Sequence, residues 1–295
     1  MSGTDASGLV DPEGERAGTG PCARFLRRTD ADRFLLAIAA PPEHRPALFA
    51  LYACNAEIAK TREVVSEPML GEIRLQWWRE AIAECFEGNP RRHEVVLPLA
   101  TAIRESAPER PLFETLIDAR ARDLEDGGIE SLADFETYAR ATSGNLIRLA
   151  QQMIAAPETA ESIEAAGHAG IAYALIGQIR AMPHHLAVKH TMLPRALLRD
   201  AGADETLLFR ARPAPEIAKG AGRLLEVAED HLAKARALRR GVPAAATPVF
   251  LATRLAASHA RQLRRAGGDP FDGRLANPPA LRALALAWAA RTRRW

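Results

Sequence analysis

Residues 170–194 read GIAYALIGQIRAMPHHLAVKHTMLP, and this stretch decides the fold. Small residues recur in its first half at spacings of four, three and four, which places them on one face of a helix: Gly170, Ala174, Gly177 and Ala181. Small side chains on that face allow a second helix to approach closely. Pro183 disturbs the helix because it has no N–H and its ring crowds the preceding turn. The sequence therefore predicts a buried helix over residues 158–182, followed by a polar and basic stretch.

A second stretch, residues 47–63, reads ALFALYACNAEIAKTRE and also combines apolar with small residues. Its apolar side chains predict a helix over residues 46–65 with much of its surface buried. We expect this helix to face the helix at 158–182 across a central cavity. Glu63 and Arg180 would then lie near that cavity and not on opposite outer surfaces.

The composition favours helices nearly throughout the chain. Alanine and leucine dominate the 295 residues, and long runs of β-branched residues are missing. Apolar residues make up 47%, which is enough for a sizeable core. A formal net charge of only +2 and an aromatic content of 5% argue against a nucleic-acid-binding protein. The prediction is an all-α fold, built as one large helical bundle.

Proline, glycine and capping residues mark the ends of the remaining helices. They divide the chain into segments at about 30–39, 66–87, 93–106, 112–126, 131–155, 216–240, 247–266 and 279–295. Asp118 and Arg122 are four residues apart and are expected to pair. No convincing linker separates the segments, so we expect one domain over residues 24–295. Residues 1–23, with four acids and few apolar side chains, are expected to be a disordered lead.

Cysteine usage and hydropathy bear on the compartment. The three cysteines, Cys22, Cys54 and Cys85, are widely spaced and form no CxxC pair, which favours a reducing environment. No apolar run reaches the length of a membrane span, and the N-terminus has no apolar segment of signal type. We expect a cytoplasmic protein. The C-terminal arginines form a solvated face or touch an anionic inner membrane peripherally: Arg254, Arg261, Arg264, Arg265, Arg291, Arg293 and Arg294.

Several motifs of common active sites are missing from the sequence, among them GxGxxG after a strand, the Walker loop, GxSxG and HExxH. His184, His185 and His190 suggest a metal site. However, their spacing gives no i, i+4 pair on a helix, and no cysteine lies near them. A solvated or phosphate-facing basic loop accounts for them better, so the sequence predicts no metal site.

Short motifs along the chain resemble the squalene/phytoene synthase family, the all-helical head-to-head prenyl transferases. They are Leu51-Tyr52-Ala53, Trp78-Arg79, Leu116-Ile117-Asp118 with Asp123-Leu124, Tyr138 with Ser143-Gly144-Asn145, and Leu193-Pro194. The resemblance is strongest over about residues 30–194 and continues more weakly to about residue 265. It implies a helical bundle of isoprenoid synthase type with a central cavity.

Active members of that family carry two DxxxD motifs on facing helices, whose carboxylates hold the Mg²⁺ ions that grip a diphosphate. In this chain the first motif falls on Ala59 and Glu63. Ala56 stands where the family has a diphosphate-binding arginine, and Lys60 adds a positive charge where metal would sit. The first motif is therefore degenerate and retains one acid.

The second motif departs from the family as well. Its acidic positions fall on Ala181 and His185, Gly177 replaces an asparagine, and only Arg180 remains. Residues 171–194 contain no acid at all, so half of the metal cradle is missing. Alanine offers no ligand, and histidine suits Zn or Cu better than Mg²⁺. The resemblance therefore implies that no catalytic residue, metal or other cofactor is to be expected.

Polar side chains near both motifs remain candidates for a pocket that binds an anion, such as a diphosphate, without a bridging metal. They are Tyr52, Glu57, Asn145, Gln178, Arg180, His184 and Lys189. We expect the basic members of this set, together with His185, to lie near Glu57 and Glu63 at the mouth of the pocket.

A narrower resemblance joins Asn55-x-Glu57-x-Ala59, LQWWRE at 75–80 and RAMPHH at 180–185. This combination is similar to the degenerate branch of the family, to which the mitochondrial assembly factor for respiratory complex I belongs. It implies a non-catalytic assembly factor or scaffold with protein partners in a membrane respiratory complex. Two alternatives remain open. One is a protein that binds an isoprenoid or quinone-like chain, and the other is an active prenyl transferase that holds Mg²⁺ on Asp118, Asp123, Glu125 and Asp126.

Overall fold

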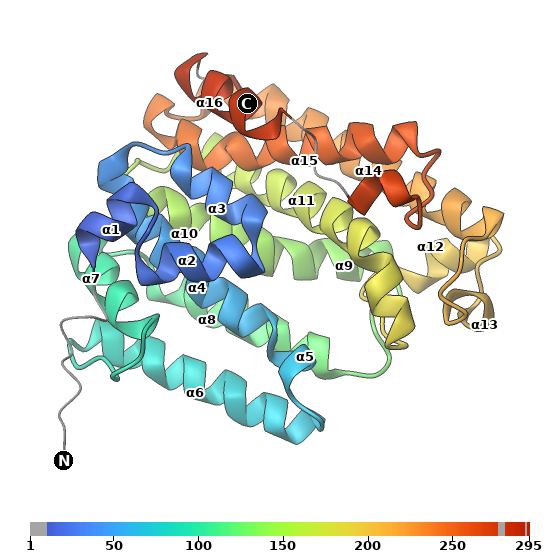
Figure 1. The fold of residues 1–295 in the computed structure, drawn as a ribbon, viewed down its shortest axis with the longest axis horizontal. Helices are drawn as coiled ribbons and strands as arrows, with labels where there is room; N and C mark the ends of the chain where they lie inside the picture. Colours follow the sequence, from blue (N-terminus) through green and yellow to red (C-terminus); the bar gives the residue numbers. More distant parts are fainter. Residues whose placement is uncertain (1–10, 277–280, 293) are drawn as a thin grey trace.

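The computed structural model describes residues 11–276, 281–292, 294 and 295. Within these ranges the backbone forms helices and turns and contains no β-strand, which confirms the all-α prediction (Figure 1). The α-helices are α1 (Pro12–Ala17), α2 (Pro21–Thr29), α3 (Ala31–Ile38), α4 (Arg45–Ala59), α5 (Thr61–Val64), α6 (Pro68–Phe86), α7 (Val96–Ser106), α8 (Arg110–Arg120), α9 (Leu132–Ala139), α10 (Asn145–Met153), α11 (Ala160–Ala187), α12 (Arg195–Asp200), α13 (Glu205–Leu208), α14 (Pro215–Ala237), α15 (Thr247–Arg265) and α16 (Arg282–Thr292).

The central helix α11 packs against α9, α10, α14 and α15, and it joins two apolar clusters (Figure 1). One cluster surrounds α4 and takes in Ala165 from the first half of α11. The other surrounds α14 and takes in Ile179 from the second half. Because one long helix contributes to both clusters, it fixes the position of α4 relative to α14. No helix within the described ranges is both long and apolar enough to cross a bilayer.

The expectation of a disordered lead over residues 1–23 is wrong for residues 11–23, while residues 1–10 lie outside the described ranges. Asp11 caps α1 by accepting a hydrogen bond from the Gly14 N–H. The buried Glu15 carboxylate accepts hydrogen bonds from the N–H groups of Cys22 and Ala23, at 2.7 and 3.0 Å. A carboxylate at the start of α2 satisfies two amides that the helix cannot, so the acids of this segment are used structurally.

The central helix also runs further than expected, because it continues through Pro183 to Ala187. At its start, Thr159 accepts a hydrogen bond from the Ser162 N–H and the Ser162 hydroxyl accepts one from the Thr159 N–H, which forms a capping box. Pro183 removes one backbone donor, but Met182 and Leu186 on either side of it are buried. Tertiary packing therefore holds a final turn that proline would end in an isolated helix.

The small-residue face of α11 is tightly packed at one end and open at the other. A Cβ on Gly170 would lie 2.3 Å from the backbone N of Gly144. Gly144 ends the π-helical turn Arg140–Gly144, which interrupts the continuous helix expected over residues 131–155. A Cβ on Gly177, two turns further along, would meet no atom within 4 Å. The close helix approach predicted from the small residues is thus confirmed at Gly170, whereas Gly177 adjoins open space.

Alanine at these two glycines is expected to change stability in opposite directions. Both substitutions gain helix propensity, worth up to about 1 kcal/mol. Gly177→Ala should keep that gain because nothing obstructs the new methyl group. Gly170→Ala should lower the free energy of unfolding by about 2 kcal/mol, because the obstructing atoms belong to backbone and overpacking outweighs propensity. Urea unfolding of the two variants provides the comparison, and equal effects would contradict the packing described here.

Candidate functional site

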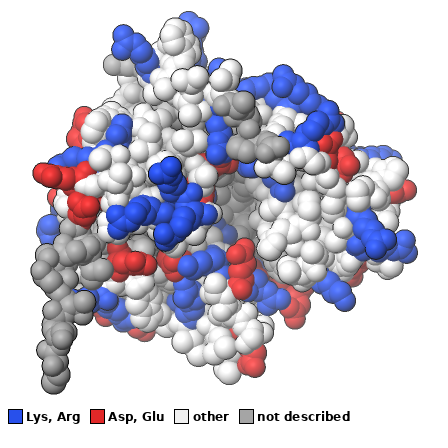
Figure 2. All heavy atoms as spheres, in the orientation of Figure 1, with Lys and Arg blue, Asp and Glu red and all other residues white. Residues whose placement is uncertain are grey.

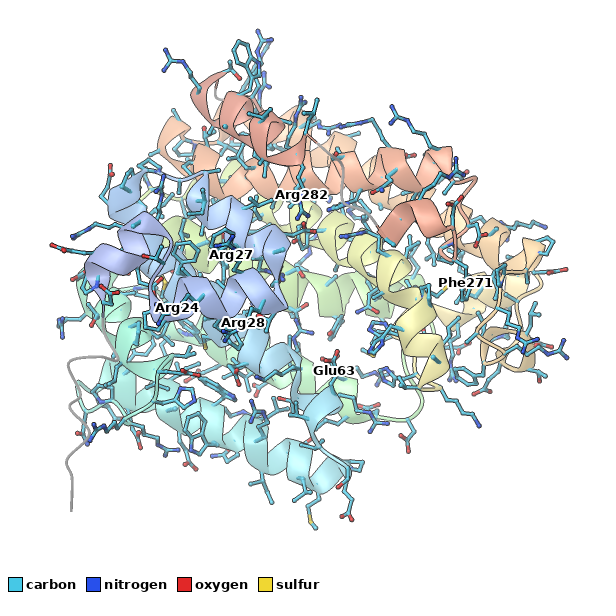
Figure 3. The ribbon with its side chains drawn as sticks, in the orientation of Figure 1. Arg24, Arg27, Arg28, Glu63, Phe271 and Arg282 are labelled. Atoms are coloured by element: carbon cyan, nitrogen blue, oxygen red, sulfur yellow. The ribbon has the colours of Figure 1, made fainter. Side chains whose placement is uncertain are left out.

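One face of the molecule is hollowed in front of α11 (Figure 2). In the same orientation, Figure 3 places the following side chains around the hollow: Arg24, Arg27, Arg28, Glu63, Phe271 and Arg282. Ala56 and Ala59 on α4 and Gly177 and Ala181 on α11 are partly exposed. The residues that replace the family's acidic motifs are therefore not buried in the core, and Gly177 has free space beside it.

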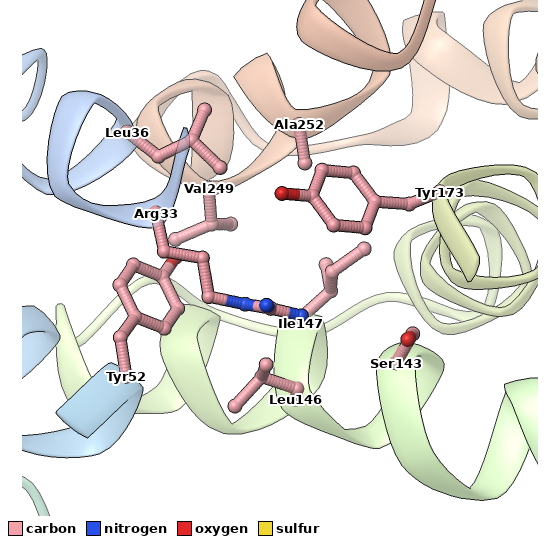
Figure 4. A pocket seen from close by; sticks show the side chains of 9 residues that line it. All are labelled: Arg33, Leu36, Tyr52, Ser143, Leu146, Ile147, Tyr173, Val249 and Ala252. Carbon is pink, nitrogen blue, oxygen red and sulfur yellow. The ribbon is translucent and has the colours of Figure 1, made fainter. Parts of the chain in front are cut away.

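Between α4 and α11 lies a small cavity that is lined in part by Arg33. Arg33 of α3 lies between Tyr52 of α4 and Tyr173 of α11 (Figure 4). The space left among these side chains is about 20 Å³, which is room for about one water molecule. Pockets for drug-sized ligands usually measure about 300–1,000 Å³. This part of the bundle therefore has no room for a prenyl chain while Arg33 is in place.

The charge of Arg33 is balanced within the bundle. Its guanidinium donates to the Asp30 carboxylate at 2.5 Å and lies 5.2 Å from the centre of the Tyr173 ring. Burial lowers the pKa of Arg33, but the neighbouring Asp30 and Tyr173 more than compensate, so the net change is upward. Burial also raises the pKa of Tyr52 and of Tyr173, which keeps both hydroxyls neutral. Arg33 thus stays charged and is held in place. It lies outside the two family motifs, so the sequence did not predict its role.

The carboxylate of Asp32, whose side chain is only 13% exposed, is bonded to Arg180, the one second-motif residue that this chain retains. Asp32 accepts hydrogen bonds from Arg180 at 3.0 Å, from His259 Nε2 at 2.9 Å, and from Arg282. Burial raises the pKa of Asp32, but the hydrogen bond from His259 and the charges of the two arginines lower it by a larger amount, so that the pKa is about 2. Arg180 is therefore already paired with a protein carboxylate, which competes with any anion that would bind there.

The first motif is occupied in a similar way. The buried Glu57 carboxylate accepts hydrogen bonds from Lys60 and, at 2.6 Å, from Arg74 of α6. The Glu57 side chain thus ties α4 to α6, while Arg180, which was expected near it, is bonded to Asp32. Lys60, in turn, lies 5.1 Å from the ring centre of Phe25. Lys60 is therefore ion-paired with Glu57, but because Arg74 shares the same carboxylate, this cluster of three side chains keeps one net positive charge.

The basic stretch at the end of α11 faces an acidic turn instead of Glu57. His185 and His190 both lie close enough to Asp123 for its charge to raise their pKa values against the effect of burial. Asp123 itself accepts a hydrogen bond from the Tyr138 hydroxyl at 2.6 Å and pairs with Arg120 at 3.1 Å. His184 and Lys189 are exposed, so this segment is split between a buried part and a solvated part.

Acidification is expected to destabilise the protein through His185. Burial, followed by the neighbouring His190 and His184, lowers the pKa of His185 to about 4. The unfolded chain takes up this proton near pH 6.5, whereas the folded protein resists it until about pH 4. The unfolded state therefore binds more protons in this window, and stability should fall by about 3 kcal/mol as the pH drops through it. Denaturant unfolding between pH 7 and 4 measures the effect.

The control for that experiment is His185→Gln, which cannot take up a proton. Burial also lowers the pKa of His93 and of His168, and burial raises that of Glu15 to about 7, which acts in the opposite direction. The difference between wild type and variant isolates His185. Identical slopes of stability against pH in the two proteins would contradict its assignment.

The four carboxylates of the enzyme alternative are each paired with an arginine. Asp118 pairs with Arg79 at 2.8 Å and not with Arg122, as was expected from their spacing. The remaining pairs are Asp123 with Arg120, Glu125 with Arg122, and Asp126 with Arg62, at 3.1, 2.9 and 3.2 Å. Among the described residues no three side chains of the metal-ligating types come together as a metal site. All four acids therefore take part in ion pairs that join parts of the structure.

Two further pocket candidates remain without an assigned role. Asn145 is partly exposed at the first position of α10. Gln178 lies on α11 next to Gly177, and within the described part of the chain its buried Oε1 has no hydrogen-bond partner. Neither residue is among those that line the small cavity around Arg33.

Comparisons with known proteins agree with the family resemblance found in the sequence motifs. The family model for squalene/phytoene synthase matches residues 26–284. The mouse protein "NADH dehydrogenase (ubiquinone) complex I, assembly factor 6" is 28% identical over 265 residues, which covers 90% of this chain and 79% of the relative. The human protein of the same name is 26% identical over 250 residues, with 85% and 75% covered.

Solved structures show the same fold at lower sequence identity. Squalene synthase HpnC from Alicyclobacillus acidocaldarius superposes with a TM-score of 0.74 at 19% identity, covering 90% of this chain and all of the other. A dehydrosqualene synthase in complex with ligand gives a TM-score of 0.78 at 14% identity, with 96% and 99% covered. These likenesses confirm the isoprenoid synthase type of bundle that the sequence motifs imply.

Proposed function

We propose that this chain, which belongs to the squalene/phytoene synthase family, acts as a non-catalytic assembly factor for a membrane respiratory complex of the complex I type. The observation that carries the proposal is the similarity to relatives named complex I assembly factor 6, which extends over most of both chains. The fold alone would not distinguish this role from that of an enzyme, because the solved enzymes share it.

The site supports the proposal through the way its charges are used. Catalysis in this family relies on carboxylates that are free to hold metal and on cations that are free to hold diphosphate. Here Arg180 is paired with Asp32, Lys60 with Glu57, and Arg33 fills the space between the tyrosines. A bundle whose charged side chains are paired with one another in this way suits a rigid surface for protein partners. We also propose that this protein binds no metal ion at the site.

Deletion of the gene tests this function. Membranes of the deletion strain should oxidise NADH more slowly and contain less assembled complex I on native gels, whereas succinate oxidation and isoprenoid content should be unchanged. Plasmid-borne wild type should restore NADH oxidation, and so should Glu63→Ala, which removes the last acid of the two motifs. A strain that loses an isoprenoid and keeps its respiration would show that the chain is an enzyme.

A further inference from the structure

The outer face of α16 is apolar and exposed to solvent. Leu281, just before the helix, and Leu284 and Trp288 on it are spaced by three and four residues and are 67%, 68% and 66% exposed. This spacing places them on one side of the helix. The opposite side is buried, with Leu286 and Ala289 packed in the α4 cluster. The helix therefore has apolar side chains on two opposite faces, and the protein covers only one of them.

The body of the protein holds this helix firmly at both ends. At its start, Arg282 donates a hydrogen bond to the carboxylate of Asp32. Beyond its end, Trp295 is buried and stacks on Phe250 of α15, with ring centres 4.7 Å apart. Since these contacts anchor α16, its outer face is a fixed surface and not the underside of a helix that has yet to fold down.

The charges around this face have one sign. Residues 273–295 contain five arginines and no acid. Of these, Arg291 and Arg294 are exposed at the end of α16, and Arg293 lies outside the described residues. Figure 2 shows Lys and Arg side chains at the upper edge, where Figure 1 places α16. An apolar stripe in a sequence segment whose charged residues are all arginines is complementary to a surface that is apolar and negatively charged.

We propose that this face of α16 docks on the surface of an anionic lipid bilayer. Leucine and tryptophan side chains would enter the boundary between headgroups and acyl chains, as in other interfacial helices. Tryptophan favours that depth because its ring is amphipathic, and the arginines would meet the lipid phosphates. The inference goes beyond the proposed function and does not depend on it, because it rests on this surface alone.

A second exposed apolar group, at α5 and the start of α6, shows that exposure alone does not make a membrane site. It comprises Val64, Met69, Leu70 and Ile73. Residues 62–74 contain three acids and two arginines, and Arg62 and Arg74 are each paired with a further acid, Asp126 and Glu57. The group therefore has net negative surroundings, which an anionic bilayer would repel. In Figure 1, α6 and α16 lie at opposite edges of the molecule. The sign of the surrounding charge therefore selects α16, and the α6 group serves as an internal control.

The test is co-sedimentation of the full chain with vesicles of phosphatidylcholine containing about one third phosphatidylglycerol. We expect binding that weakens with added salt and is lost on pure phosphatidylcholine. Leu284→Ser with Trp288→Ser should weaken binding at least about tenfold. Arg291→Glu with Arg294→Glu should do the same at low salt. The matched control, Met69→Ser with Ile73→Ser, should bind like wild type. All these side chains are on the surface, and thermal unfolding verifies that each variant folds.

Three results would overturn the proposal. The first is wild-type protein that stays in the supernatant with anionic vesicles at low salt. The second is binding that survives the α16 substitutions or is abolished by those on α6. The third is a concentration-dependent dimer of the wild type that Trp288→Ser dissociates, which would show that a second copy covers this face.

Discussion

The purified protein, incubated with farnesyl diphosphate and Mg²⁺, is expected to release no head-to-head prenyl product. Ionising an allylic diphosphate leaves a carbocation beside a highly charged leaving group, which must be met by Mg²⁺ and fixed cations. Ala59, Ala181 and His185 leave Glu63 as the one acid of the four family positions. Extraction and mass spectrometry of the products measure the outcome, with a dehydrosqualene synthase as positive control. Release of pyrophosphate at a rate above that of the buffer would contradict the expectation.

Restoring the acids separates the loss of metal ligands from the loss of space. The triple variant Ala59→Asp, Ala181→Asp, His185→Asp should bind Mg²⁺ more tightly than wild type in calorimetry, because four carboxylates then replace one. It should still form no product, since Arg33 continues to fill the space between Tyr52 and Tyr173. Product formation by the triple variant alone would show that Arg33 moves aside for a substrate.

Replacing Asp32 by alanine is expected to lower the free energy of unfolding by about 3–5 kcal/mol, the loss typical of breaking a buried ion pair. The substitution leaves Arg180, His259 and Arg282 without their shared carboxylate. The low pKa of Asp32 points the same way. A folded value of about 2, against 3.8 in the unfolded chain, corresponds to about 2 kcal/mol of stability above pH 4. Urea unfolding at neutral pH measures the loss.

The control for Asp32 is Asp118→Ala, which breaks the exposed ion pair with Arg79 and should cost less than about 1 kcal/mol. The pH dependence provides a second check. Because the pKa of Asp32 is lowered by folding, its contribution is present above pH 3.8 and is lost as the pH falls towards 2. The deficit of Asp32→Ala should therefore shrink in that range. Equal losses for the two variants would mean that Asp32 is no more than a surface pair.

The sequence predicted the helices better than it predicted their partners. Periodicity shows which face of a helix is apolar, and motif order shows which family the helices resemble, so the bundle and the close approach at Gly170 followed from residues near one another in the chain. Asp32 and Arg33 lie on a short helix before the first motif. Their partners include His259 and Arg282, more than 220 residues away. No local pattern encodes a contact of that separation.

Two features that local rules did not predict have the same origin in tertiary packing. Pro183 is a helix breaker by local rules, but the buried residues on either side of it hold the last turn of α11 in place. Glu57 was expected near the basic residues of the opposite helix, and its carboxylate is bonded to Arg74 of α6. In both cases the local rule holds: proline disfavours a helix, and an acid pairs with a cation. Contacts with another helix then decide the outcome.

The partners of Asp32 are synthesised at different times, and this affects how the chain folds during synthesis. Helices near the N-terminus emerge from the ribosome first and begin to fold while the rest of the chain is being made. Asp32 is made 250 residues before its partner Arg282. Until then a growing chain carries an acid without its full set of cations, next to apolar helices that still lack α16. A chain that ends before residue 282 would therefore lack both this bond to Asp32 and the packing of α16 on the α4 cluster.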